Sequence, residues 1–235
     1  MMKILIIDQC SKAKEYREES QSFNAVEIDD HGLDDLRDRP GTSSKAARKL
    51  YAGRQQEYIS DAVAKLRSAG DSVDRYFISA GFGLVAETEK LPPYDVTFAD
   101  YSKSEIEERA EKLGIQDDLL AVVDDSYDII FFALGSDYYR SFDLPTVLKT
   151  VPTETWAVCF NHESVTDTFE NVVSLPARTE EAKEQETIVV ALKGRYLQSF
   201  ASHRSNGKQV TSAEDIESFC TTEYTTQTNL DQIDE

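Results

Sequence analysis

Residues 128–135, DIIFFALG, decide the fold class of this chain. The run is apolar without alternation, which is typical of a strand buried on both faces of a parallel sheet. A second run of this kind, TWAVCF, follows at residues 155–160. Two such strands predict a three-layer α/β fold, with a mostly parallel central sheet and helices on both of its faces.

Short apolar runs alternate with helical patterns along most of the chain. We expect strands at residues 3–7, 25–28, 74–79, 128–134, 155–160 and, most weakly, 171–175. We expect helices at residues 44–69, 102–114 and 180–203. Gly194 lies inside the last of these helices, where an interior glycine costs about 1 kcal/mol relative to alanine. Its presence there indicates close packing or the close approach of a ligand.

The chain has the organisation of a single domain. No Ser-, Gly- or Pro-rich linker divides its 235 residues, so we expect one domain over residues 1–220 and a polar, acidic tail over residues 221–235. No run approaches 18 apolar residues, which predicts a cytoplasmic protein without membrane contact. The oligomeric state stays open.

No cofactor or metal is expected from the motifs of the sequence. Cys10, Cys159 and Cys220 are widely spaced, so they predict neither a disulfide framework nor a zinc site. A Walker loop, a nucleophile elbow and an acid pair are also missing from the sequence.

The net charge of −19, from 44 acidic and 25 basic residues, is unusual for a chain of this length. The acids are dispersed, as in the proteins of salt-accumulating archaea; an acidic protein of ordinary salt is the alternative. In dilute salt this charge would repel nucleic acid. In molar salt the Debye length is only about 3 Å, so local cationic pockets still act. The charge therefore does not exclude DNA or tRNA as a partner.

The stretch SAGFGLVA after the third strand pattern matches the dinucleotide-binding fingerprint G-x-G-x-x-A through Gly81 and Gly83. A dinucleotide site needs a helix that begins at these glycines. Pro92 and Pro93 follow too closely to leave room for that helix. Either the glycines make a tight strand exit, or their small size lets backbone amides approach another ligand.

Six short motifs occur in a fixed order over roughly residues 3–200. They are C-S-K at 10–12, A-x-x-L-Y-x-G at 47–53, S-A-x-x-G-L at 79–84, P-Y-D at 93–95, L-G-x-x-Y at 134–138 and A-L-K-G-R-Y at 191–196. The set resembles the YaaA-type peroxide-stress proteins, their small archaeal relatives of unknown function and, more distantly, the accessory domain of archaeosine-synthase-type tRNA-modifying enzymes.

This resemblance implies a layout similar to uracil-DNA-glycosylase-like folds and a nucleobase or nucleotide as ligand, without identifying a reaction. The YaaA type is similar to a DNA-associated stress protein, with a positively charged cleft and an added helix-hairpin-helix element. This chain has no convincing signal for that element. DNA, tRNA and a free nucleotide therefore all stay open as partners.

Four loops that follow strands are expected to meet at the carboxyl edge of the sheet, where α/β proteins bind ligands. They are the segments 9–12, 80–84, 135–139 and 161–164. The catalytic candidates in or near them are Asp8 and Asp95. The ligand-binding candidates are Ser11, Lys12, Ser79, Gly81, Gly83, Tyr94, Ser136, Asp137, Tyr138 and Lys193.

Each candidate has a purely structural alternative. Asp8 acts as a general base or caps the next turn. Tyr94 stacks on a base, with Asp95 accepting polar hydrogens or activating water, or it packs in the core. Asp137 binds ligand or caps a helix. Lys193 contacts phosphate or is a plain surface cation.

Cysteine and histidine offer weaker candidates. Cys10 is a nucleophile only if a cation such as Lys12 lowers its pKa, and otherwise it is a buried, inert thiol. His162 follows a strand, but His31 and His203 lie too far from the motifs to complete a triad or a metal site.

Three functions fit these patterns. The first is a nucleic-acid-associated protein of stress response, base modification or defence, with a pocket for a nucleobase or nucleotide. The second is a glycosylase-like hydrolase or transferase, with Asp8 or Asp95 as the base and Lys12 or Lys193 on phosphate. The third is a module that binds a partner without catalysis.

Overall fold

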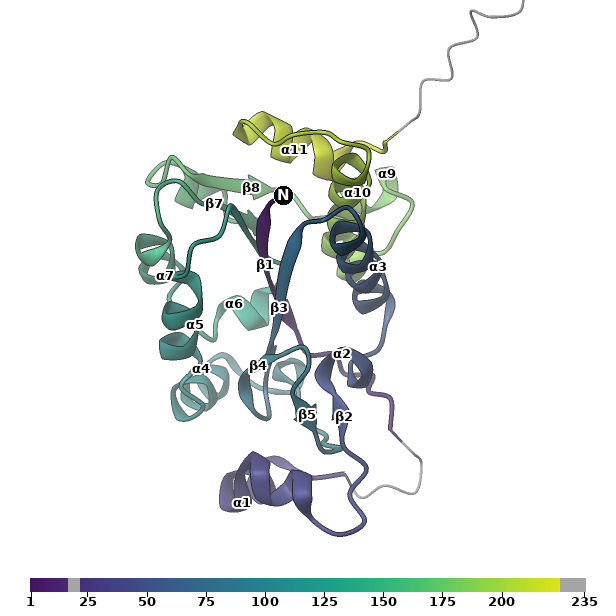
Figure 1. Cartoon of the computed structure of the whole chain (residues 1–235). Helices are drawn as coiled ribbons and strands as arrows, with labels where there is room; N and C mark the ends of the chain where they lie inside the picture. The colour runs from purple at the N-terminus through teal and green to yellow at the C-terminus, as the bar shows by residue number, and fades with distance from the viewer. Residues whose placement is uncertain (17–21, 225–235) are drawn as a thin grey trace, which may run out of the picture.

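The computed structural model describes residues 1–16 and 22–224 of the chain (Figure 1). Its centre is a six-stranded sheet with the strand order β4-β3-β1-β6-β7-β8. Every neighbouring pair is parallel except β3 and β4, which are antiparallel. The strands are β1 (Lys3–Gln9), β3 (Ser72–Ser79), β4 (Gly83–Ala86), β6 (Ile129–Phe132), β7 (Trp156–Phe160) and β8 (Val172–Leu175). The predicted α/β class with a mostly parallel sheet is confirmed.

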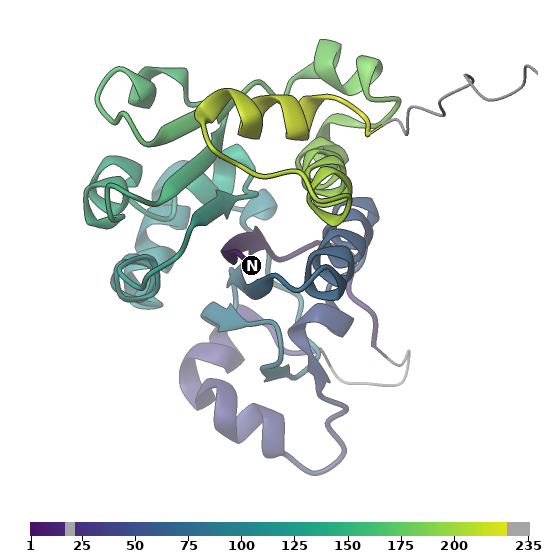
Figure 2. The ribbon, with the colours of Figure 1, turned by 45° about the horizontal axis from the view of Figure 1, so that its top comes forward.

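Helices lie on both sides of the sheet (Figure 2). On one side α3 (Arg54–Ser68) and α10 (Leu192–Ser205) run next to each other, and α11 (Ala213–Thr221) packs on α10. The other side carries α4 (Lys103–Lys112), α5 (Ile115–Val123) and α7 (Leu144–Thr150). The remaining elements are α1 (Ala25–Asp38), β2 (Lys45–Ala46), α2 (Ala47–Leu50), β5 (Lys90–Leu91), η1 (Phe98–Asp100), α6 (Ser136–Tyr139), α8 (Glu163–Thr166), α9 (Thr179–Glu184) and η2 (Val189–Ala191).

The unbroken apolar runs of the sequence supply two cores at once. Side chains of a strand alternate between the faces of the sheet, so Phe131 packs with α3 and α10 while Phe132 packs with the helices of the opposite face. Ile6 and Ile7 divide in the same way, and all four side chains are fully buried. Both faces of these central strands are therefore dry, as the lack of alternation predicted.

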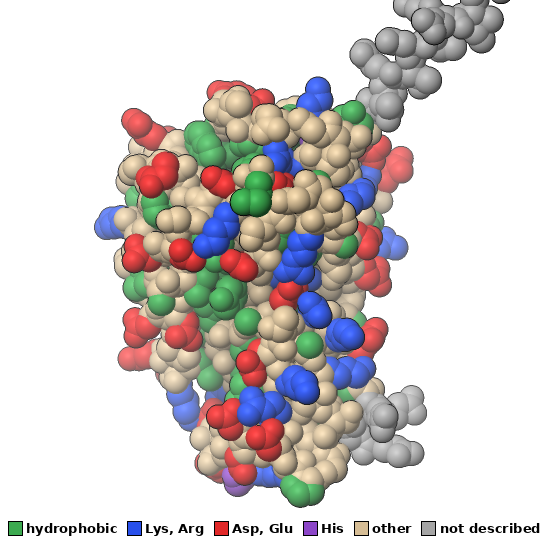
Figure 3. Space-filling model, in the orientation of Figure 1, with side chains coloured by type: hydrophobic (Ala, Val, Ile, Leu, Met, Phe, Trp, Pro, Cys, Tyr) green, Lys and Arg blue, Asp and Glu red, His purple; other side chains and the backbone are tan. Residues whose placement is uncertain are grey.

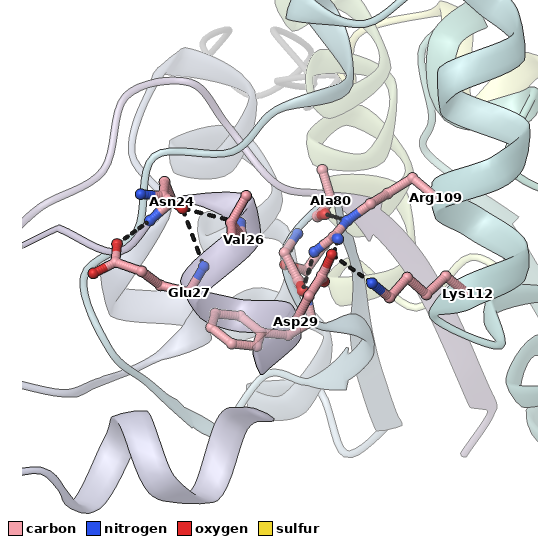
Figure 4. Close-up of polar contacts among 10 residues, drawn as sticks. Asn24, Val26, Glu27, Asp29, Ala80, Arg109 and Lys112 are labelled. Carbon is pink, nitrogen blue, oxygen red and sulfur yellow. Dashed lines mark hydrogen bonds and ion pairs between the residues drawn. The ribbon is translucent and has the colours of Figure 1, made fainter. Parts of the chain in front are cut away.

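The expected strand at residues 25–28 is wrong, because these residues form the first turn of α1 (Figure 4). The Asn24 side chain accepts hydrogen bonds from the backbone N–H groups of Val26 and Glu27. The Glu27 carboxylate in turn accepts the N–H of Asn24. This capping box holds the backbone in the helical conformation, and it outweighs the preference of the β-branched residues for a strand.

Two of the expected helices are each interrupted. The pattern at residues 44–69 contains α2 and α3, which are separated at Gly53, where φ is 119°. The pattern at residues 180–203 contains α9, η2 and α10. The helix expected at residues 102–114 is confirmed as α4, which Ser102 caps.

The described structure ends in a packed helix close to the expected end of the domain at residue 220. Residues 213–221 form α11, in which Ile216 and Cys220 are fully buried. Of the tail expected over residues 221–235, residues 225–235 lie outside the described part of the chain. Helix α11 ends at Thr221, the residue at which the tail was expected to begin.

The strand order reverses beside β1, since the chain first adds β3 on one side of it and later adds β6 on the other. The connections that leave β1 and β6 therefore diverge to opposite sides of the sheet at its carboxyl edge. In open parallel sheets such a reversal leaves a crevice in which ligands bind.

Candidate ligand-binding cleft

A cleft of about 770 Å³ opens at this reversal, at the carboxyl ends of β1, β6 and β7. This volume lies within the range of small-molecule sites. The main segments that line it are residues 9–12, 52–56, 134–140, 160–162 and 188–193, with contributions from Thr97, Ala99 and Ala177. Three of the four loops expected at this edge therefore meet here, those that follow β1, β6 and β7.

Six of the sequence-predicted ligand-binding residues line the cleft together. They are Ser11, Lys12, Ser136, Asp137, Tyr138 and Lys193. They come from three segments that are far apart in the sequence, the exits of β1 and β6 and the start of α10. The remaining candidates lie elsewhere.

The loop after β3 is a tight hairpin turn that does not line the cleft, so the tight strand exit describes Gly81 and Gly83 correctly. The N–H groups of Gly81 and Phe82 donate to Ser79 Oγ at 3.2 and 3.1 Å. Arg109 covers the loop from outside, with Nε 2.9 Å from the carbonyl oxygen of Ala80 (Figure 4). These amides are already engaged in the turn and are not offered to a ligand.

Tyr94 lies in the core and is fully buried, which corrects its expected role as a platform for a base. Its hydroxyl group lies 2.7 Å from Tyr51 Oη and 2.9 Å from Ser79 Oγ. Its ring touches Gly81, where a Cβ atom would lie 2.9 Å from the ring carbons. Burial raises the pKa of Tyr94 well above its ordinary value, so the hydroxyl group stays protonated within this network. Asp95 beside it is exposed and is not part of the cleft lining.

Asp8 lies beneath the cleft in a buried ion pair, which corrects its expected role as a general base. It is fully buried, and its Oδ2 accepts a hydrogen bond of 2.6 Å from Arg75 Nη2. Its Oδ1 accepts a second bond of 2.8 Å from Gln55 Nε2. Both carboxylate oxygens are thus occupied by donors from the protein, and neither is exposed to a ligand.

The charge of the cleft is opposite to that of the chain. Four cations line it, and Asp137 is the only carboxylate among the described residues that do so. The cations are Lys12, Arg54, Arg140 and Lys193. The whole chain, in contrast, carries 44 acidic and 25 basic residues. The cleft therefore attracts anions within a protein that repels them at long range.

The beginning of α3 forms one wall, which sequence reasoning missed. Its N-cap is Gly53, whose lack of a side chain leaves the first N–H groups of the helix without a side-chain acceptor. Arg54 and Gln55 follow at the cleft, and Gln55 Oε1 is buried without a hydrogen-bond partner among the described residues. A glycine followed by Arg-Gln-Gln was the available signal, but a long continuous helical pattern concealed it.

The end of β7 supplies a second wall. Asn161 has a φ of 61°, and its amide group bridges to the backbone of Ala177 with bonds of 2.7 and 3.2 Å. His162 follows, and its ring packs on Tyr139 with the centroids 4.2 Å apart. Burial lowers the pKa of His162, so its imidazole is neutral at pH 7 and can accept a proton. The histidine that the sequence made a weak candidate therefore lies at the cleft.

Cys10 is almost completely buried in the wall of the cleft. Its Sγ lies 2.9 Å from Tyr138 Oη, which also donates to the carbonyl oxygen of Cys10. Burial raises the pKa of Tyr138 above its ordinary value, so this hydroxyl group remains a donor. The arrangement is that of an inert thiol packed against a tyrosine.

The third wall is apolar and open to solvent. Ile188 and Val190 expose 55% and 64% of their surface, although both lie beside the cleft in the segment that leads into α10. Exposed aliphatic side chains next to cationic ones suit a ligand that has both an apolar and an anionic part.

Comparison with protein-family models and with curated proteins finds no match for this chain. Among residues 1–16 and 22–224, no helix has the length and apolar character needed to cross a bilayer. In the same part of the chain, His, Cys, Asp and Glu side chains form no group suited to hold a metal ion. The function is therefore inferred from the cleft.

Proposed function

We propose that this protein binds nucleic acid or nucleotides, and that the cleft accommodates the phosphate and base of one nucleotide unit. The observation that carries the proposal is the reversal of charge in the cleft, where Lys12 and two arginines face one carboxylate in a chain of net charge −19. A phosphate is the anionic group that nucleotides offer, and arginine binds it through two parallel hydrogen bonds.

The walls of the cleft suit the two parts of a nucleotide. Arg54 stands at the uncapped beginning of α3, where both its guanidinium group and the free backbone N–H groups favour an anion. Lys12 and Arg140 add further positive charge. Ile188 and Val190 offer an apolar surface for a base or sugar.

A second groove favours a strand of nucleic acid over a free nucleotide. This groove, of about 760 Å³, shares Ala52, Gly53 and Gln56 with the cleft. It carries the cations Lys45, Arg48, Lys49 and Lys90 against the acids Glu15, Glu57 and Asp61. Basic side chains gather over α2, α3 and the β2–β5 pair on this face of the molecule (Figure 3). Cations spaced along a groove follow a phosphate backbone.

The resemblance to the YaaA-type and archaeosine-synthase-type proteins also supports a nucleotide or nucleic acid as ligand, because some of the shared motifs line the cleft. The C-S-K and L-G-x-x-Y motifs and Lys193 of the A-L-K-G-R-Y motif line the cleft. The S-A-x-x-G-L and P-Y-D motifs contribute Ser79 and Tyr94 to the core instead. The shared motifs thus combine residues of the cleft with residues of its support.

The alternative of a hydrolase or transferase with Asp8 or Asp95 as its base has little support. Neither carboxylate lines the cleft. The alternative of a partner-binding module remains an outcome of the binding experiment.

Removing the two arginines of the cleft is expected to weaken binding of a short labelled oligonucleotide by at least about tenfold, because each charge-assisted hydrogen bond contributes about 1.5–3 kcal/mol. The variant is Arg54→Gln with Arg140→Gln, both at exposed positions. Fluorescence anisotropy would measure the Kd for single-stranded DNA, duplex DNA, tRNA and a mononucleotide.

The matched control is Lys103→Gln with Lys149→Gln, which makes the same change in net charge at exposed positions outside both grooves. Equal weakening in the two double variants would mean that binding follows net charge alone and would contradict a specific site. Failure of the wild-type protein to bind any of the four probes, in dilute or molar KCl, would leave the partner-binding module as the better description.

We infer from the dispersed acidity that the protein works in concentrated salt. Raising KCl from about 0.1 M to about 1 M shortens the Debye length from about 10 Å to about 3 Å and so weakens the mutual repulsion of the excess acids. The midpoint of thermal unfolding is expected to rise by several degrees, as circular dichroism would measure. A rise of the same size in sucrose of equal osmolality would contradict charge screening as the cause.

A further inference from the structure

Lys193 differs from the other cations of the cleft in its burial. It lines the cleft but exposes only 7% of its surface. Lys12 pairs with Asp100 at 3.1 Å, and Arg140 lies 3.8 Å from Asp137. No described acidic side chain forms an ion pair with Lys193, and no described residue accepts a hydrogen bond from it.

The position of Lys193 in the fold opposes a positive charge. It lies in the first turn of α10, whose N-cap, Ala191, offers no side-chain acceptor. The N-terminal end of a helix carries partial positive charge, which disfavours an ammonium group there. Burial lowers the pKa of Lys193 as well, although the Asp8 carboxylate beneath it acts in the opposite direction. The charged or titratable groups that share the lining with it are Cys10, Lys12, Arg54, Asp137, Tyr138, Tyr139, Arg140 and His162.

The backbone around Lys193 is held firmly. A Cβ atom on Gly194 would lie 2.8 Å from the carbonyl oxygen of Gln55 and 3.0 Å from Tyr58 Cβ, so α10 and α3 touch directly at this point. The same turn of α3 supplies Arg54 and the unpartnered Gln55 Oε1 to the cleft. The amine therefore lies in a rigid setting next to a site for anions.

We propose that Lys193 Nζ is a nucleophilic amine that forms a Schiff base with the aldehyde of a phosphate-bearing sugar. This inference rests on the proposed function, since the arginines and Lys12 would hold the phosphate. The Nζ lone pair adds to the carbonyl carbon to give a carbinolamine. Loss of a proton from nitrogen and departure of the protonated hydroxyl group as water then form the imine. No oxidant or reductant is needed.

The ligand class follows from the different roles of the arginines and of Lys193 in the cleft. Guanidinium groups stay charged at all relevant pH values and retain phosphate, whereas a buried, unpaired lysine is free to react. A nucleotide unit that has lost its base opens to a sugar aldehyde carrying phosphate. The same chemistry occurs in a free sugar phosphate, and the experiment separates the two sources.

The test is reduction of the imine by sodium cyanoborohydride at about pH 7, which delivers a hydride and leaves a stable secondary amine. The probes are an oligonucleotide with one abasic site, the same oligonucleotide with a tetrahydrofuran analogue that has no aldehyde, and deoxyribose 5-phosphate. Trypsin does not cleave after an alkylated lysine, so an adduct on Lys193 produces a peptide that spans residues 184–195. We expect this lysine to carry severalfold more adduct than any other, because it lies buried in the cleft beside the cations that would hold the phosphate, and burial favours its neutral form.

Two variants and one control decide the outcome. Lys193→Met and Lys193→Arg are expected to lose the adduct, while Lys103→Arg, at an exposed position, is expected to keep it. Adducts spread evenly over the lysines, or none on Lys193 with either aldehyde, would overturn the proposal even if neither variant folded, because the wild-type peptide map suffices. Binding of the abasic-site oligonucleotide without an adduct on Lys193 would overturn the Schiff base and leave the proposed function intact. No binding of any probe would reject both.

Discussion

Replacing Asp8 by asparagine is expected to lower the free energy of unfolding by about 3–5 kcal/mol, because it leaves the Arg75 guanidinium group buried without its counter-ion. The two side chains expose 0% and 1% of their surface, and the atoms of the pair lie 2.6 Å apart. Such a loss is a large share of the stability of an ordinary domain. Urea unfolding followed by circular dichroism would measure it.

A double variant tests whether the loss of stability comes from the unpaired charge of Arg75 or from the loss of the Asp8 carboxylate itself. Adding Arg75→Met to Asp8→Asn removes the stranded charge, so the double variant is expected to recover part of the lost stability. Glu180→Gln, which breaks an exposed pair with Lys183, is the control and is expected to leave the unfolding free energy nearly unchanged. A fully stable Asp8→Asn protein that loses only turnover of a nucleobase substrate would contradict the structural role and restore Asp8 as a catalytic base.

Replacing Gly194 by alanine is expected to destabilise the protein by about 1–3 kcal/mol, in the range of overpacked cores. Replacing an interior glycine of a helix by alanine usually stabilises a protein by about 1 kcal/mol. A loss of stability here would therefore show that the close contact between α10 and α3 outweighs helix propensity. The new Cβ atom would lie 2.8 Å from the backbone oxygen of Gln55, which a rotamer change cannot move away. Chemical unfolding would measure the loss.

Ser205→Ala, at an exposed position of the same helix, is the control for this substitution and is expected to stay within about 0.5 kcal/mol of the wild type. A stabilised Gly194→Ala protein would show that α3 and α10 have room to separate. The rigid setting assigned to Lys193 would then be wrong.

The sheet was largely predictable because its strands carry their signal locally. In residues 129–132 and 156–160, the residues on both faces of the sheet are apolar. A continuous apolar run of this length is typical of a strand that is buried on both faces. The prediction of a strand at residues 25–28 was wrong because the decisive signal is polar. It is the capping box of Asn24 and Glu27, which lies in and around a short β-branched run. An aliphatic pair alone does not distinguish a strand from the first turn of a helix.

The candidate site was predictable only in part, because its chemistry depends on contacts between distant segments. The motif after β1 indicated Lys12 as a residue of the site. The sequence around Asp8, however, does not predict that Asp8 pairs with Arg75 on the neighbouring strand. Tyr94 has the same local sequence whether its ring stacks on a ligand or fills the core. Arg54 joined the cleft because the chain breaks at Gly53, a break that the helical pattern on both sides conceals.

The order in which the cleft acquires its walls matters during synthesis. All six strands of the sheet are complete by Leu175, whereas the apolar wall and Lys193 come from residues 188–193 and depend on the docking of α10. A growing chain can therefore pair its strands while still attached to the ribosome and yet have no closed site. The cleft therefore cannot be complete before the chain has reached Lys193, well after the last strand of the sheet.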